Sequence, residues 1–340
     1  MKLINTVLDF FTPKKSNHFI SYHLFFLIFS LIILFSNIYM TANSCMNAND
    51  FAIYQEGIYK LSNFNEFNPY ASVRDIRILS DHFDPIIYLP ALLIKIFGAN
   101  PYVLLVFEWF VWLLFVVLVY RLGNFDWKSS RWIKSLSLII FSKSILYAVA
   151  FPIHPSTWSI VPITLLVYNI DRNNFKGIVF SSLFLILFKE LFIFMVLGLS
   201  FFYLLKKNYK IFLSLFSISA VAYILVFKVR LMIYGHSIDY GHGLIHNFLE
   251  NPFVYLWTNF KAMNFPYTMI IPPLLLINKK NYKSFLPIMF LILPGFAIHL
   301  LGGRLARHHS ISLITAVLVL GIFKTNPRAI VVLIFLATGT

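Results

Sequence analysis

Charge is scarce in this sequence. Charged residues make up 12% of its 340 residues, whereas soluble globular domains carry roughly 25%. Hydrophobic residues make up 59% of the chain, and its mean hydropathy is +0.78. This composition excludes an ordinary soluble domain and indicates an integral membrane protein.

Cysteine and acidic residues are also rare. Cys45 is the only cysteine, which excludes an intramolecular disulfide and a cysteine-ligated metal cluster. Only 13 residues are Asp or Glu, and six of these lie between Asn47 and Pro90. Because the few carboxylates of this chain gather in one segment, we expect that segment to carry functional residues. The six are Asp50, Glu56, Glu66, Asp75, Asp81 and Asp84.

Long apolar runs fill most of the remaining sequence. They predict an all-α integral membrane protein, a bundle of roughly 10–11 transmembrane helices. The first run exceeds the 7–15 apolar residues of a signal peptide, so we interpret it as a retained helix. The whole chain, 1–340, is predicted to be a single membrane domain with no soluble C-terminal domain. Its expected parts are a first transmembrane helix at 19–41, a large extracytoplasmic loop with juxtamembrane helices at 42–100, and the remaining transmembrane helices at 101–338.

The basic residues predict the orientation. With the N-terminus in the cytoplasm, every expected inner loop is short and basic, and these loops hold 17 of the 28 Lys and Arg residues. The net charge of +15 is therefore a topology signal, and nucleic acid is not an expected partner. We predict a multi-pass protein of the cytoplasmic (inner) membrane whose active face is extracytoplasmic.

Asp50 directly follows the first apolar run. It could cap a helix over residues 51–61, or it could act as a catalytic base or metal ligand at the membrane surface. Gln55 and Glu56 lie one to two helical turns further on, within reach of a shared site.

His82 and Asp84 lie in the sequence Asp81-His82-Phe83-Asp84-Pro85, just before the chain returns to apolar residues. They belong either to a hairpin of solvated charges or to a site in which they orient a substrate hydroxyl. A divalent cation shared with Asp50 is a further alternative. Because this spacing matches no metal-binding motif, no metal ligands are assigned.

Three further polar residues interrupt apolar sequence on the expected outer face. His154 occupies a short turn between two apolar runs and is either interfacial or part of the site. Lys189 and Glu190 break an otherwise uncharged stretch, and ionisable groups among apolar membrane residues usually face the bundle interior or a water-filled cavity. They form either a self-neutralising pair or a site for a phosphate.

Arg304 and Arg307 are three residues apart and are followed by His308. On a helix both guanidinium groups would point to one face, and arginine matches phosphate oxygens in a two-pronged geometry. Anchoring to lipid headgroups is the alternative.

Four of these motifs, in this order, resemble a family of bacterial polytopic membrane proteins of unknown function that is related to the GT-C glycosyltransferases. The motifs are D-F-A-I-Y-Q (50–55), D-H-F-D-P (81–85), F-P-I-H-P (151–155) and F-K-E (188–190), and the match covers most of residues 45–205. The GT-C enzymes include protein O-mannosyltransferases and the aminoarabinose transferases, whose donors are polyprenyl-linked sugars. Many of them carry two adjacent acids in the first outer loop, whereas Asp50 is flanked by Asn49 and Phe51.

The resemblance implies an inverting glycosyltransferase that moves a sugar from a polyprenyl-phosphate donor to an acceptor hydroxyl of a glycan, lipid or protein. In this hypothesis Asp50 is the catalytic base. Apart from the lipid-linked sugar no cofactor is expected, and a divalent cation is not supported. The substrate pocket would be lined by Gln55, Glu56, His82, Asp84, His154 and Glu190, and the donor phosphate would be bound by Lys189, Arg304, Arg307 and His308.

Two other classes of function stay open. A transporter or flippase for lipid-linked or anionic solutes would also use charged residues inside the membrane. A catalytically inactive membrane partner with a GT-C-like fold would explain the missing second acid.

Overall fold

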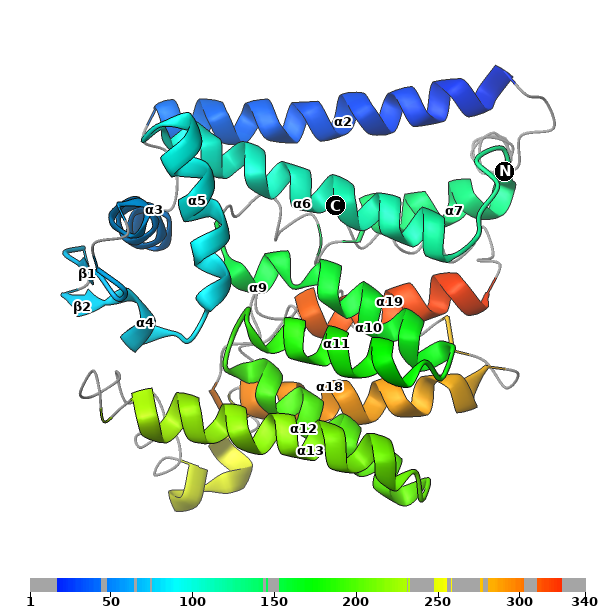
Figure 1. The fold of residues 1–340 in the computed structure, drawn as a ribbon. Coiled ribbons are helices and arrows are strands. Elements are labelled where there is room, and N and C mark those ends of the chain that lie inside the picture. Colours follow the sequence, from blue (N-terminus) through cyan, green and yellow to red (C-terminus); the bar gives the residue numbers. More distant parts are fainter. Residues whose placement is uncertain are drawn as a thin grey trace.

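The computed structural model describes a helical protein with a very small sheet (Figure 1). The all-α architecture predicted from the apolar runs is confirmed, whereas the number of membrane crossings stays a prediction. The structure describes residues 17–43, 48–63, 66–73, 75–142, 145, 153–230, 232, 248–255, 258, 276–277, 281–302 and 311–325.

Three of the described helices are long and apolar enough to cross a membrane. They are α2 (Asn17–Ala42), α6 (Pro101–Leu122) and α13 (Tyr209–Ile224), which continues as the π-helix η2 (Leu225–Val229). Asparagine starts two of them, because the side chains of Asn100 and Asn208 accept hydrogen bonds from backbone N–H groups in the first turns of α6 and α13.

Shorter helices fill the space between the long ones. Gly198 allows α12 and α18 to approach closely, because a Cβ at this position would lie 2.3 Å from the Phe290 carbonyl oxygen. The helices are α7 (Ser130–Ile140), α9 (Pro155–Trp158), α10 (Ile160–Asp171), α11 (Phe175–Ile186), α12 (Leu191–Leu205), α18 (Tyr282–Gly302) and α19 (Ile311–Lys324).

Most of the predicted apolar segments coincide with these helices. The sequence has an apolar run at 133–152 that is helical in α7 as far as Ile140, and most of its second half lies outside the described residues. Two further apolar runs of the sequence, at 264–277 and 328–338, also lie largely or entirely outside them.

The acid-rich segment folds into short elements at one end of the molecule (Figure 1). Gly57 lets α4 pack directly on α3, because a Cβ there would lie 2.0 Å from the Ile78 side chain. The hairpin is closed by the Asn68 side chain, whose oxygen accepts from the Leu79 N–H at 2.8 Å. The elements are α3 (Ala48–Ser62), β1 (Tyr70–Ala71), antiparallel β2 (Ile76–Arg77), α4 (Ile78–Asp81), the 3-10 helix η1 (Pro85–Ile87) and α5 (Tyr88–Phe97).

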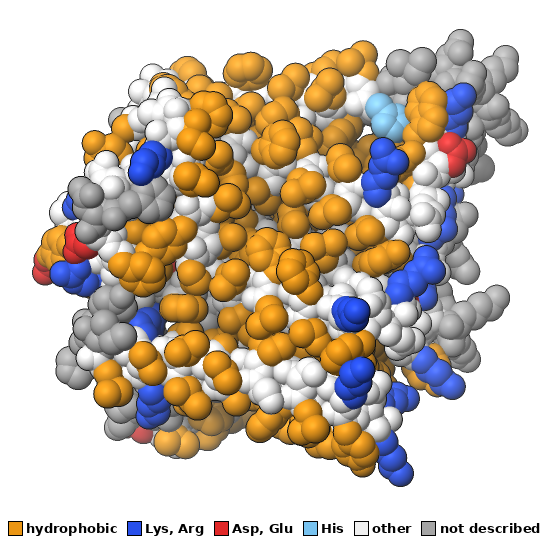
Figure 2. All heavy atoms as spheres, in the orientation of Figure 1, with side chains coloured by type: hydrophobic (Ala, Val, Ile, Leu, Met, Phe, Trp, Pro, Cys, Tyr) orange, Lys and Arg blue, Asp and Glu red, His pale blue; other side chains and the backbone are white. Residues whose placement is uncertain are grey.

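The opposite end is basic. The turn after α10 carries Arg172, and the turn after α12 carries Lys206 and Lys207. Figure 2 shows Lys and Arg side chains gathered at this end, with hydrophobic side chains covering the surface between the two ends. A broad apolar surface between two polar ends is the pattern of a membrane protein.

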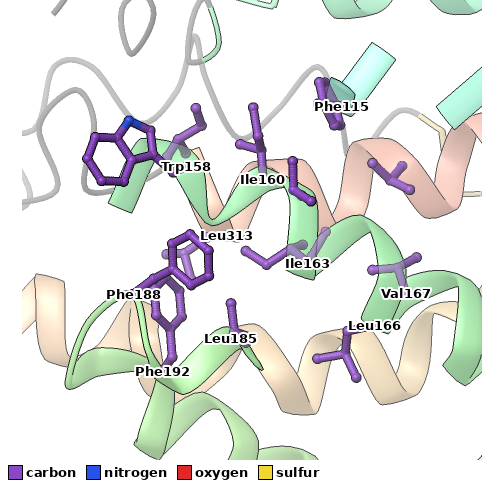
Figure 3. Packing of buried hydrophobic residues seen from close by; sticks show 14 of the residues in the cluster. Phe115, Trp158, Ile160, Ile163, Leu166, Val167, Leu185, Phe188, Phe192 and Leu313 are labelled. Carbon is purple, nitrogen blue, oxygen red and sulfur yellow. The ribbon is translucent and has the colours of Figure 1, made fainter. Parts of the chain in front are cut away.

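The core joins elements that are far apart in the sequence. Figure 3 shows Phe188 and Phe192 packed beside Leu313 of α19, with Trp158 and Ile160 close by. All five side chains are buried. Phe188 directly precedes Lys189, and Trp158 belongs to the short helix that follows His154, so this core supports both polar stretches.

Candidate functional site

Asp84 is a buried carboxylate at the acid-rich end of the molecule. It lies between α4 and η1, where Pro85 starts the 3-10 helix, and only 1% of its surface is exposed. Its Oδ2 accepts a hydrogen bond of 2.9 Å from the Tyr54 hydroxyl on α3. Its Oδ1 accepts none from any side chain or backbone group that the structure describes. Asp84 is therefore not a solvated surface charge.

Burial governs the protonation of Asp84. Removal from water raises the pKa of its carboxyl from 3.8 to about 7, although the positive charge of His82 and the Tyr54 hydrogen bond act in the opposite direction. Such a carboxyl exchanges a proton near neutral pH, as a general acid or base must.

His82 and Glu190 connect the acid-rich segment to the turn between α11 and α12. The Nδ1 atom of His82 lies 2.8 Å from Oε1 of Glu190, and the Phe83 N–H donates to Oε2 at 3.0 Å. A backbone hydrogen bond from the Ile86 N–H to the Leu187 carbonyl, also 3.0 Å, runs alongside. Residues 82–86 and 187–190 are thus held together by three contacts.

Glu190 is a stable negative charge in this arrangement. Burial alone would raise the pKa of Glu190, but the charge and hydrogen bond of His82 and the charge of Lys189 outweigh it and lower the pKa to about 2. Among the described residues Glu190 forms an ion pair with His82, and the charge of Lys189 also acts on Glu190.

Lys189 brings a buried cation to the same place. Its side chain is 8% exposed and acts electrostatically on both Asp84 and Glu190. A buried ammonium costs free energy unless an anion accompanies it. The negative charge of Glu190 acts on Lys189 at this place.

His154 approaches the cluster from α9. Its ring packs edge-on against the Tyr54 ring, with 5.3 Å between centroids, and its side chain is buried. The preceding residue, Ile153, has a φ of 66°, and its N–H donates to Oε2 of Glu108 on α6. Tyr54 thus lies between His154 and Asp84.

A second buried cation lies near this end of the fold. Arg230 follows the π-helix η2 and donates from Nη1 to the Leu79 carbonyl of α4 at 3.1 Å. This contact joins the end of the helix α13–η2 to Leu79, which lies three residues before His82 in the chain.

The structure brings together five of the residues predicted from the sequence: His82, Asp84, His154, Lys189 and Glu190. Their roles in substrate binding stay predictions. Glu56 lies in a separate set of contacts, because its carboxylate accepts from Lys60, from the Ser72 N–H and hydroxyl, and from the Val73 N–H. Gln55 is half-buried on α3.

Four predicted residues cannot be assigned contacts. Asp50 lies in the first turn of α3, which begins at Ala48 rather than at residue 51 as expected, and its side chain lies outside the described part of the structure. Arg304, Arg307 and His308 also lie outside the described residues.

Tyr54, Glu108 and Arg230 were not among the site residues predicted from the sequence. The available signals were the spacing of Tyr54, one helical turn after Asp50, and the position of Glu108, an acid within the apolar helix α6. Among the described side chains, no group of three or more His, Cys, Asp or Glu residues could hold a metal ion.

Apolar helices around a buried charged cluster define a helical integral membrane protein. Residues 45–303 match the family described as "Predicted membrane protein (DUF2079)", and the chain belongs to this family. Comparison with curated proteins and with solved structures gave no match.

Proposed function

We propose that the protein is a GT-C-type glycosyltransferase of the bacterial cytoplasmic membrane, with its N-terminus in the cytoplasm and 10–11 membrane crossings predicted from the sequence. It would transfer a sugar from a polyprenyl-phosphate donor to an acceptor hydroxyl at the outer face. The observation that carries this proposal is the cluster of buried Asp84, Tyr54, His154 and Lys189 with the half-buried pair His82 and Glu190. It combines a carboxyl that titrates near neutral pH with a buried cation, next to apolar helices.

The reaction needs one proton acceptor and one group that stabilises the leaving phosphate. The acceptor oxygen forms a bond to the anomeric carbon while the bond from that carbon to the phosphate oxygen breaks. The hydroxyl proton moves to a carboxylate, and the polyprenyl phosphate leaves with the bonding electrons and inversion at the anomeric carbon. Fixed positive charge stabilises the negative charge that grows on the phosphate.

We assign the proton acceptor to Asp84, because its pKa of about 7 suits proton transfer at neutral pH. Asp50, the base predicted from the sequence, is the alternative and lies one helical turn before Tyr54. Lys189 is the cation for the leaving phosphate, and Arg304, Arg307 and His308 stay predicted partners of the same phosphate.

The test uses the full-length protein in proteoliposomes with a polyprenyl-phosphate hexose labelled in the sugar. We expect the wild-type protein to release labelled sugar from the donor, to water or to an added lipid acceptor. Replacing a proton acceptor typically costs 10²–10⁴-fold in rate, so Asp84→Asn should lose about that much while Asp50→Asn loses less. The matched control is Asp75→Asn, because Asp75 is an exposed acid of the same segment.

A larger loss in Asp50→Asn than in Asp84→Asn would return the role to Asp50. If the wild-type protein releases no sugar from any polyprenyl-phosphate donor, the transferase proposal fails. Movement of an anionic solute into the vesicles would then favour a transporter. Absence of both activities would favour an inactive membrane partner.

A further inference from the structure

Glu108 is an acidic residue inside α6, a helix that is otherwise apolar up to Arg121 and long enough to cross a membrane. It lies seven residues after the start of α6, or about 10 Å along the helix at 1.5 Å per residue, and its side chain is only 3% exposed. An ionisable group in such a position is costly and usually serves a function. The mechanism proposed above does not use it.

The carboxylate of Glu108 holds a strained turn. Its Oε2 accepts a hydrogen bond from the N–H of Ile153, 45 residues later in the chain. Ile153 has a φ of 66°, in the left-handed region that β-branched residues rarely adopt. This conformation is strained and persists only where the surroundings enforce it.

The strained turn directly precedes His154. Ile153 is fully buried, so packing holds its side chain while the Glu108 carboxyl holds its N–H. His154 then has extended backbone angles and starts α9, with Pro155 in the first helical position. The packing of the Ile153 side chain and the hydrogen bond of its N–H together restrict the position of the His154 ring.

The ring of His154 contacts Tyr54, whose hydroxyl donates to Asp84. A chain of direct contacts therefore leads from α6 to the buried carboxyl: Glu108, the Ile153 N–H, His154, Tyr54 and Asp84. The side chain of Trp158 in α9 also interacts with the Glu108 carboxyl. Both Ile153 and Trp158 lie in the segment 153–158 that carries His154, so the contacts of Glu108 hold this segment against α6.

We propose that Glu108 is a positioning residue that holds the Ile153–His154 turn in its left-handed conformation and thereby sets the place of His154 against Tyr54 and Asp84. Glu108 does not touch the reacting groups in this arrangement. The inference deepens the proposed function, since the site that it organises is the one assigned to sugar transfer.

The test compares two substitutions that differ in one property. Glu108→Gln keeps an oxygen that can accept from the Ile153 N–H, whereas Glu108→Met has a similar size but offers no such oxygen. Trp112→Phe is the matched control, because Trp112 is buried one turn further along α6 and packs against Phe26 of α2. The primary readout is the NMR signal of the His154 ring in protein labelled at histidine, assigned by its loss in His154→Asn.

We expect Glu108→Met to shift the His154 signal and Glu108→Gln to leave this signal near its wild-type position. Trp112→Phe should lower the melting temperature of the protein but leave the His154 signal unshifted. A displacement of about 1 Å in a catalytic site can cost on the order of 100-fold in rate. Sugar release should therefore fall by about that factor in Glu108→Met and be largely rescued in Glu108→Gln.

An unchanged His154 signal in folded Glu108→Met protein would overturn the inference, and so would equal shifts in Glu108→Met and Glu108→Gln. The readout does not depend on activity. If His154 responds as expected but the wild-type protein transfers no sugar, the positioning role stands and the proposed function fails.

Discussion

Asp84 combines almost complete burial with a single described hydrogen bond, and this combination makes its protonation sensitive to its neighbours. Burial disfavours the charged form, whereas His82 and Tyr54 favour it. The pKa of about 7 is the balance of these effects, so changes at single residues should move it in directions that can be stated in advance.

The first prediction concerns stability and pH. The folded protein holds a proton on Asp84 up to about pH 7, whereas the unfolded chain releases it near 3.8. Unfolding therefore releases a proton in this window, and stability falls as pH rises through it, by up to about 1.4 kcal/mol per pH unit. In Asp84→Asn this contribution to the pH dependence should vanish, as thermal unfolding in detergent between pH 4 and pH 7 would measure. The same slope in Asp84→Asn and wild type would contradict the assignment, and Asp75→Asn is the control.

The second prediction concerns Tyr54. Its hydroxyl stabilises the charged form of Asp84, so Tyr54→Phe should raise the pKa of Asp84. A hydrogen bond contributes about 1 kcal/mol, which corresponds to an increase of somewhat under one pH unit. Infrared titration of the carboxyl band that is missing in Asp84→Asn would measure it. Tyr59→Phe, an exposed tyrosine of the same helix, should have no effect; a decrease in Tyr54→Phe would show that the hydroxyl does not donate to Asp84.

These residues also show how far sequence reasoning reaches. His154, Lys189 and Glu190 could be selected because polar groups are conspicuous between apolar runs. Tyr54 could not, because a tyrosine on an amphipathic helix looks like ordinary packing until its partner is known. The pairing of Glu190 with His82, 108 residues away, was also beyond prediction, since nothing in the sequence shows which distant residue meets Glu190.

Glu56 shows how the elements of the acid-rich segment are joined. Its carboxylate links α3 to the turn between β1 and β2 through Lys60 and through the backbone and hydroxyl of Ser72. Burial would raise the pKa of Glu56, but these contacts, with Lys60 foremost, lower it to about 2. The ion pair is largely local to the segment, and its role is to hold the hairpin against α3.

The third prediction tests this link. Glu56→Ala should speed amide hydrogen exchange in the hairpin around Ser72 and reduce its local stability by about 1–2 kcal/mol, since hydrogen bonds to a charged group are lost. Because the pKa of Glu56 is lowered, the wild-type contribution should persist above pH 4.5 and disappear as pH falls toward 2. Glu66→Gln, which alters the exposed ion pair with Arg77, is the control. Unchanged exchange around Ser72 would rule out this role for Glu56.

The whole molecule has one acid-rich end and one basic end, separated by an apolar surface (Figures 1 and 2). The apolar runs predicted the helices of the apolar part, because a segment that crosses a membrane must satisfy its backbone hydrogen bonds internally, as the helix α6 can. The short sheet and the packing of α4 on Gly57 were not predictable, because they depend on contacts between side chains within a polar segment.

The fourth prediction concerns orientation. In a Cys45→Ala background, Ser72→Cys should react with a membrane-impermeant maleimide in intact cells, because Ser72 is exposed at the acid-rich end. Asn173→Cys, in the turn after α10, should react only after permeabilisation, since basic turns face the cytoplasm. Labelling of both positions in intact cells, or the reverse pattern, would contradict the predicted topology.

The contact of residues 82–86 with the turn at 187–190 has a consequence for biosynthesis. Asp84 leaves the ribosome long before Glu190, and α6, α7, α10 and α11 must all be synthesised between them. Until then the acid-rich segment lacks its contacts with residues 187–190, and His82 lacks its carboxylate partner. A nascent chain stalled before residue 187 would therefore present an incompletely packed acid-rich segment to membrane proteases, whereas in a chain released after α12 this segment could already be packed against residues 187–190.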